Sequence, residues 1–159
     1  MPRVLREPVP CASLAPVFAR LTDASGLCWL DSGPRPGRGA VSALAFEPFA
    51  VFAARGRRCA VDRGGRRDEF EADPFDAFGG LLAEFRGGGG FLGPGAFGWI
   101  SYDAGRTIER IPSRAADDLG LPDLWFAFCD IAVVRDHGRG ETAVVGRECG
   151  VPDFAARFR

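Results

Sequence analysis

The feature that most constrains the fold of this chain is a series of short apolar runs bounded by glycine, proline or charged residues. Runs of this length are typical of β-strands. We expect strands in GLCWLDSG (26–33), VSALAFEP (41–48), FAVFAARG (49–56), AFGWIS (96–101) and ETAVVGR (141–147). LWFAFCDIAVVRD (124–136) is apolar on both faces, which predicts one central strand with ETAVVGR as its antiparallel neighbour across the turn HGRG.

One segment has a clear helical pattern. In ADPFDAFGGLLAEFRGGGG, Asp73 is placed to cap a helix and Pro74 to begin it, and apolar residues recur at helical spacing until the glycine run. Two shorter helices are expected, one in SLAPVFARL with Ser13 as the N-cap and one in DAGRTIER with Asp103 as the N-cap. The order of elements predicts an α+β fold, with a mainly antiparallel sheet and flanking helices.

Length and charge limit the classes of function. The chain has 159 residues, 47% of them hydrophobic, which suits a single domain over 1–159 with one core. The net charge is −1, so no overall field favours nucleic acid or an anionic membrane. The arginine-rich stretch 55–71 contains Gly64-Gly65 and alternates with acidic residues, which favours a hairpin with a charged edge over a nucleic-acid surface.

Cysteine usage and hydropathy indicate a soluble, cytoplasmic protein. The five cysteines form no C-x-x-C pair and lie in apolar segments, a pattern typical of reduced, buried thiols. No signal peptide pattern begins the chain, and no apolar run reaches membrane-spanning length.

Three candidate sites have stronger structural interpretations. GPGAFG (93–98) matches the dinucleotide-binding glycine pattern, but a glycine run precedes it and a strand follows it, where the pattern needs a strand and then a helix. Asp117, Asp118 and Asp123 lie among turn residues, which predicts a solvated loop over a metal site. His137 lies in a predicted turn and is expected to be exposed, without a nucleophile beside it. The residues themselves therefore indicate no catalytic group, no bound cofactor and no metal ligand.

Four motifs carry a family resemblance. GAFGWISYDAGRTIERIP (95–112) resembles a signature of the chorismate-using synthases, namely component I of aminodeoxychorismate synthase and of anthranilate synthase. ADDLGLPDLWFAFCD, CWLDSG and DPFDAF are similar to other elements of the same family and occur in the same order. The Y-D-x-G-R form and the short N-terminal lead look closer to the para-aminobenzoate branch.

This resemblance implies an N-terminal region that belongs to a layered α/β sandwich, without the C-terminal chorismate-binding domain. In the family that domain carries the catalytic groups and the Mg²⁺ ligands. We therefore expect the chain to be inactive alone and to need a chorismate-binding half, in cis or in trans. The complete enzyme would aminate chorismate for folate biosynthesis, with ammonia from a glutamine amidotransferase subunit.

The resemblance also implies an aromatic amino acid pocket, with tryptophan as its candidate ligand. The positions that match are Leu30 and Ser32 in WLDSG, and Val41 and Ser42 in the following strand. Ser42 keeps the family residue, whereas Val41 stands where relatives have an aromatic residue and Ala40 where they have arginine. These departures argue against retained tryptophan binding.

Two other functions stay open. One is the same region of anthranilate synthase component I, which would place the chain in tryptophan biosynthesis. The other is a stand-alone binding or regulatory module that has kept the fold without catalysis. The amino acid in the pocket would separate the first from the main hypothesis, and a stable, monodisperse chain would favour the second.

Overall fold

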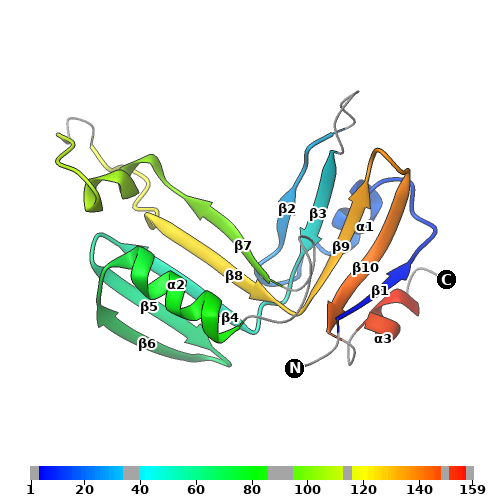
Figure 1. The fold of residues 1–159 in the computed structure, drawn as a ribbon, viewed down its shortest axis with the longest axis horizontal. Helices are drawn as coiled ribbons and strands as arrows, with labels where there is room; N and C mark the ends of the chain where they lie inside the picture. Colours follow the sequence, from blue (N-terminus) through cyan, green and yellow to red (C-terminus); the bar gives the residue numbers. More distant parts are fainter. Residues whose placement is uncertain (1–3, 34–39, 86–94, 113–115, 148–150, 157–159) are drawn as a thin grey trace.

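The computed structural model describes residues 4–33, 40–85, 95–112, 116–147 and 151–156. These residues form two five-stranded antiparallel sheets in place of the single sheet expected (Figure 1). The strands of the first sheet are, in spatial order, β1 (Val4–Pro8), β10 (Glu141–Arg147), β9 (Ile131–Asp136), β3 (Val41–Ala45) and β2 (Cys28–Leu30). β1 was not predicted, because its five residues include Arg6, Glu7 and Pro8, and it is held by its pairing with β10.

The second sheet is built from the middle of the chain. Its strands are, in order, β6 (Arg66–Glu71), β5 (Arg58–Arg63), β4 (Ala50–Arg55), β8 (Leu124–Cys129) and β7 (Gly95–Ile100). The helices are α1 (Ala15–Arg20), α2 (Pro74–Glu84), the 3₁₀ helix η1 (Tyr102–Thr107) and α3 (Val151–Ala155). Among the described residues, no helix has both the length and the apolar character needed to cross a membrane.

The two sheets meet at a corner that two strands cross. β3 continues into β4 through residues 46–49, and β8 continues into β9 through Asp130, so the ends of these interior strands meet and the two sheets diverge from there (Figure 1). The prediction of a single strand over 124–136 was therefore wrong. Asp130 forms an ion pair with Arg147 at 3.0 Å, and its carbonyl accepts the backbone N–H of Arg147. This one polar residue ends the first strand and lets the chain turn into the other sheet.

Three apolar clusters hold the fold together. One packs α1 and α3 on a face of the first sheet around Leu44, Val133 and Val144. A second packs α2 on a face of the second sheet around Phe52, Phe128 and Leu81. The third joins the remaining faces of both sheets near the corner, and its members are mostly small: Ala43, Ala45, Ala127, Cys129, Ala132, Val134, Ala143 and Val145. We call these two helix-free surfaces the inner faces.

Strand alternation explains this division. In β3, Leu44 points to the helices while Ala43 and Ala45 point to the inner face, and β9 and β10 alternate in the same way. Small residues on the inner faces let the two sheets approach closely at the corner. The expectation of an α+β fold with antiparallel pairing and flanking helices is confirmed.

The predicted helices are present, but the N-cap residues of two of them differ from those expected. Asp73 caps α2, and its carboxylate accepts the N–H groups of Phe75 and Asp76. By contrast, α1 has Leu14 at its N-cap, without a side-chain cap. The N-cap of η1 is Ser101, whose hydroxyl accepts the N–H of Ala104. Ser101 lies two residues before the expected cap, Asp103, because β7 ends directly before Ser101.

The arginine-rich segment forms the predicted hairpin of β5 and β6. Gly64 and Gly65 both have positive φ, as a two-residue hairpin turn requires. The edge strand β6 is fully exposed, and its charges pair locally, for example Arg67 with Asp62 at 3.0 Å. Such pairing protects an open edge and leaves fewer free cations for a phosphate backbone.

The glycine motif before η1 has a packing role at Gly98. A β-carbon at this position would lie 1.9 Å from the carbonyl oxygen of Trp125 in the neighbouring strand β8. Only glycine permits this approach of the two backbones. Gly93 and Pro94 of the same motif lie outside the described residues.

Candidate functional site

The four residues of the predicted amino acid pocket lie close together but do not share one surface. Leu30 and Val41 belong to neighbouring strands, and Val41 packs against the cluster of the inner faces. Leu30 is 51% exposed at the open edge of the first sheet. Ser32 is exposed just beyond β2, where its hydroxyl donates to the carbonyl of Val41 at 2.8 Å. Ser42 points to the opposite face and is buried.

Ser42 is the centre of a polar cluster that the sequence did not predict. Its hydroxyl lies 2.5 Å from Oδ1 of Asp31 and 2.8 Å from Nε2 of His137, and it accepts the N–H of Ser32 at 3.2 Å. A carboxylate only accepts, so the single hydroxyl proton goes to Asp31 and His137 donates through Nε2–H. His137 lies in a turn, as expected, but the expectation that it is exposed with no nucleophile beside it was wrong, because it is half-buried beside Ser42.

This cluster is not a hydrolytic triad. In such a triad the histidine lies between the carboxylate and the serine, whereas here Ser42 lies between Asp31 and His137. Ser42 is also only 1% exposed, so its oxygen has no access to a substrate. The hydrogen bond from Ser42, followed by the N–H of Gly33, lowers the pKa of Asp31. The cluster therefore ties the end of β2 to β3 and to the turn after β9.

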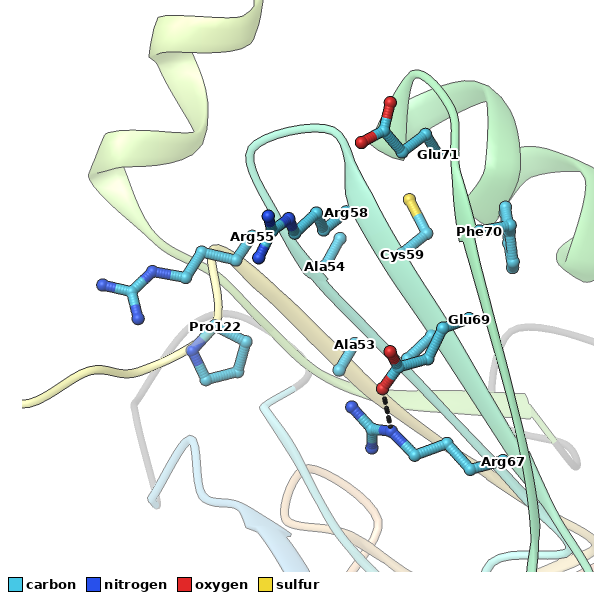
Figure 2. Close-up of a pocket in the computed structure, with 11 residues that line it drawn as sticks. Ala53, Ala54, Arg55, Arg58, Cys59, Arg67, Glu69, Phe70, Glu71 and Pro122 are labelled. Atoms are coloured by element: carbon cyan, nitrogen blue, oxygen red, sulfur yellow. Dashed lines mark hydrogen bonds and ion pairs between the residues drawn. The ribbon is translucent and has the colours of Figure 1, made fainter.

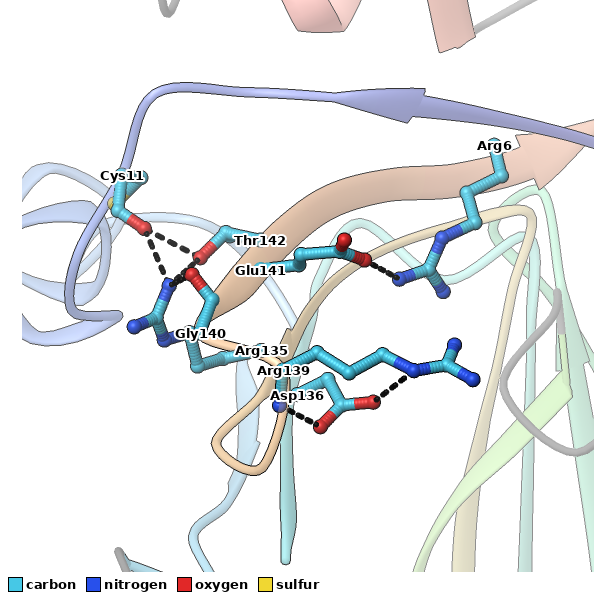
Figure 3. A network of polar contacts seen from close by, with 8 residues as sticks. All are labelled: Arg6, Cys11, Arg135, Asp136, Arg139, Gly140, Glu141 and Thr142. Atoms are coloured by element: carbon cyan, nitrogen blue, oxygen red, sulfur yellow. Dashed lines mark hydrogen bonds and ion pairs between the residues drawn. The ribbon is translucent and has the colours of Figure 1, made fainter. Parts of the chain in front are cut away.

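A second polar network lies next to this cluster on the same face. Arg135 pairs with Ser42 across β3 and β9, and its guanidinium donates to Cys11, Gly140 and Thr142 (Figure 3). The Thr142 hydroxyl also donates to the carbonyl of Cys11. These contacts close the segment after β1 over the end of the sheet. Arg135 is thus engaged by carbonyl and hydroxyl oxygens of its own chain.

The aspartate group near residue 120 forms structural contacts. Asp123 accepts the N–H of Gly56 at 2.7 Å, and Asp117 pairs with Arg55 and accepts the N–H of Gly120. Asp118 is exposed. Among the described residues, no three His, Cys, Asp or Glu side chains are arranged to hold a metal ion. Asp117 and Asp118 are exposed in the loop before β8, whereas Asp123 is half-buried there.

Two pockets lie on the second sheet. One, of about 470 Å³, lies along the β5–β6 hairpin and is lined by Ala53, Arg58, Ala60, Arg67, Glu69 and Pro122, among others (Figure 2). Within it Arg67 donates to Glu69 at 2.7 Å, which raises the pKa of Arg67. The other, of about 830 Å³, lies at the end of the sheet beside η1 and the loop 116–123. Neither pocket contains the serines of the predicted amino acid site.

Of the five cysteines, Cys149 lies outside the described residues. The other four are free thiols. Cys59 and Cys129 are buried, as expected, whereas Cys11 and Cys28 are half-buried. Burial raises the pKa of the Cys129 thiol to about 12, and it also raises the pKa of Cys28 and Cys59. These three thiols are therefore poor nucleophiles at neutral pH.

Comparison with curated proteins finds partial relatives. The chain is 32% identical over 102 residues to anthranilate synthase component 1 of Acetivibrio thermocellus, a match that covers 60% of this chain and 20% of the relative. It is 44% identical over 54 residues to aminodeoxychorismate synthase component 1 of Klebsiella aerogenes, which covers 34% of this chain and 12% of the relative. The chain is a partial homologue of these component 1 enzymes. No family model matches it.

The extent of these matches fits the N-terminal fragment that the motifs indicated. The chain spans about a fifth of the length of the component 1 relatives from A. thermocellus and Cereibacter sphaeroides. Both enzyme names recur among the relatives, so the comparisons support the chorismate-using family and leave the branch open.

Proposed function

We propose that this chain is a non-catalytic N-terminal portion of aminodeoxychorismate synthase component 1. The observation that carries this proposal is the partial homology to component 1 enzymes, combined with a fold in which the serine, histidine and aspartate side chains serve structural contacts. In this proposal the chemistry belongs to a chorismate-binding half. That half holds Mg²⁺ and receives ammonia from an amidotransferase subunit.

The inner faces are the surfaces that we assign to this half, which would complete the layered sandwich. The stacked pair Trp99 and Trp125, with ring centroids 4.8 Å apart, lies on the inner face of the second sheet. Trp99 is 42% exposed, and Leu30 is exposed at the edge of the other sheet. Large exposed aromatic side chains are typical anchors of protein interfaces.

The alternative is the corresponding portion of anthranilate synthase component 1. It is favoured by the relatives that cover most of this chain, 60% and 68%, which carry that name. The product of the reconstituted reaction separates the two branches, because one releases aminodeoxychorismate and the other anthranilate.

The test is reconstitution of activity. The purified chain is assayed with chorismate, ammonia and Mg²⁺, alone and with a separately expressed chorismate-binding half from the same organism. We expect product only from the mixture, and the product names the branch. Product from the chain alone would contradict the assignment of the chemistry to the other half. Absence of product and of binding in the mixture would favour a stand-alone module.

We also propose that the exposed Ser32, with Leu30 and Val41, is the part of the chain that would meet an aromatic amino acid. The Ser32 hydroxyl donates to Val41 and so keeps its lone pairs available to accept from a ligand ammonium group. Calorimetric titration with tryptophan tests this: binding lost in Ser32→Ala supports the pocket. No heat from the wild-type chain, alone and in the mixture, would rule it out.

A further inference from the structure

The exposed apolar surface of this chain is concentrated at one end of the second sheet. Among the described residues, six of the nine exposed large apolar side chains lie between positions 99 and 121. They are Trp99, Ile100, Tyr102, Ile108, Leu119 and Leu121, which we call the tip patch. They belong to the end of β7, to η1 and the residue after it, and to the loop before β8, and these segments lie at the end of this sheet away from the corner (Figure 1). Three of them, Trp99, Leu119 and Leu121, line one pocket. Exposed apolar side chains that gather around a pocket mark a site of protein contact.

Half of the tip patch lines a pocket, and hydrogen bonds hold one of its walls. The 830 Å³ pocket is lined by Trp99, Leu119, Leu121 and Pro122 together with polar residues. Asp123 fixes one wall, because its carboxylate accepts from Gly56 and its N–H donates to the carbonyl of Ala54 at 2.7 Å. The pocket is therefore formed before any partner arrives, which lowers the entropic cost of binding.

The charge of the pocket defines its partner. Five aspartates and three arginines line it, so its formal charge is −2. Two of the arginines are already paired, Arg106 with Asp103 at 3.0 Å and Arg55 with Asp117. Asp118 is exposed at the rim. A partner that fits this pocket brings apolar side chains and at least one positive charge.

A second copy of the chain does not meet this requirement. In a two-fold dimer through the tip patch, the same pocket would face itself and place like charges opposite each other. The patch is instead continuous with the inner face, because Trp99 lines the pocket and also stacks on Trp125 with the rings 15° from parallel. One partner can cover both surfaces.

We propose that the tip pocket binds an apolar segment with an arginine or lysine side chain from the part of component 1 that lies outside this chain. The proposal rests on the proposed function, since the relatives are about five times longer than the region that matches. The pocket adds a charge-selective contact to the apolar contact of the inner face. The pocket would also fix how the two halves align, because the basic side chain can bind at only this position.

The test measures binding of the chorismate-binding half from the same organism by calorimetry. Leu121→Ser removes apolar contact at a side chain that is 56% exposed, and Asp118→Arg reverses a charge at the rim. Leu82→Ser is the matched control, at an exposed position on α2 away from both surfaces. Thermal melting of each variant confirms that the fold is kept.

We expect Leu121→Ser to weaken binding by about tenfold or more, the value of one buried leucine. Asp118→Arg should weaken it at low salt and less so at about 0.5 M salt, where the charges are screened. Leu82→Ser should stay within about twofold of the wild type.

Several results would overturn the proposal. If the wild type binds the half and both tip variants bind equally well, the pocket is not the contact, although the proposed function stands. If the wild type does not bind at all, the proposed function fails and this inference fails with it. A wild-type dimer that Leu121→Ser dissociates would assign the patch to a second copy. If the tip variants kept binding to the chorismate-binding half and lost only binding to an amidotransferase subunit, the tip patch would belong to the contact with that subunit.

Discussion

Substitution of Gly98 is the most direct test of how closely β7 packs against β8. In Gly98→Ala the new β-carbon would begin 1.9 Å from the Trp125 carbonyl oxygen and 2.8 Å from Cα of Phe126. Both neighbours are backbone atoms of β8, so no side-chain rotation relieves the contact. The two strands must separate by more than about 1 Å at the centre of a six-residue ladder.

The cost follows from this geometry. Overpacking of a rigid site costs about 1–3 kcal/mol, and we place this substitution at the upper end because backbone must move. For a chain of this size, about 3 kcal/mol lowers the melting temperature by about 6–12 °C. Thermal and urea unfolding, followed by circular dichroism and tryptophan fluorescence, measure the change. Trp99 and Trp125 flank the site and report the separation of the strands directly.

The matched control is Gly80→Ala in α2. A β-carbon there meets nothing within 4 Å, and the residue lies exposed in the helix interior. Because alanine favours helix over glycine, this change should stabilise the chain by about 0.5–1 kcal/mol. Opposite signs for the two substitutions would support the packing role of Gly98. A Gly98→Ala variant within about 0.5 kcal/mol of the wild type would refute it.

Three further outcomes are expected. Asp73→Ala should cost about 1 kcal/mol in urea unfolding, because it removes the cap of α2, and an unchanged midpoint would contradict the capping role. The folded-state pKa of Asp31 is lowered, so its contribution to stability is present above an unfolded pKa of about 3.9 and is lost as the pH falls through the folded value. Melting temperatures between pH 6 and 3 should therefore fall less steeply in Asp31→Asn than in the wild type or in Asp23→Asn; parallel curves would exclude this linkage. The pKa of Cys129, about 12 against an ordinary 9.0, predicts alkylation at pH 8 about 10³-fold slower than in the unfolded chain, as measured by mass spectrometry, and comparable rates would show that the thiol is accessible.

Local signals in the sequence predicted the elements that depend on local chemistry. Asp73 and Pro74 start α2 where the pattern placed them, and Gly64 with Gly65 forms the hairpin turn. These features depend only on residues that are adjacent in the sequence, so they can be predicted from it. The charged pattern of β6 likewise indicated an exposed edge.

Contacts between distant residues could not be predicted in the same way. Ser42 and His137 are 95 positions apart and meet because β3 pairs with β9. The break at Asp130 depends on two sheets that the apolar pattern alone presents as one. The available signal was Asp130, the single charged residue in the otherwise apolar run of eleven residues 124–134, and it indicates a change of sheet.

The order of the strands has a consequence for folding during synthesis. The second sheet lies wholly between β4 and β8 in the chain, whereas the first sheet joins β1 with β10 through pairs such as Val4 and Arg147. As the chain leaves the ribosome, residues 50–129 can complete their sheet while β1 still lacks its neighbour. The first sheet closes only when almost the whole chain has emerged, and pairing over so long a separation is slow. Until β10 has emerged, the backbone N–H and C=O groups of β1 have no neighbouring strand to pair with.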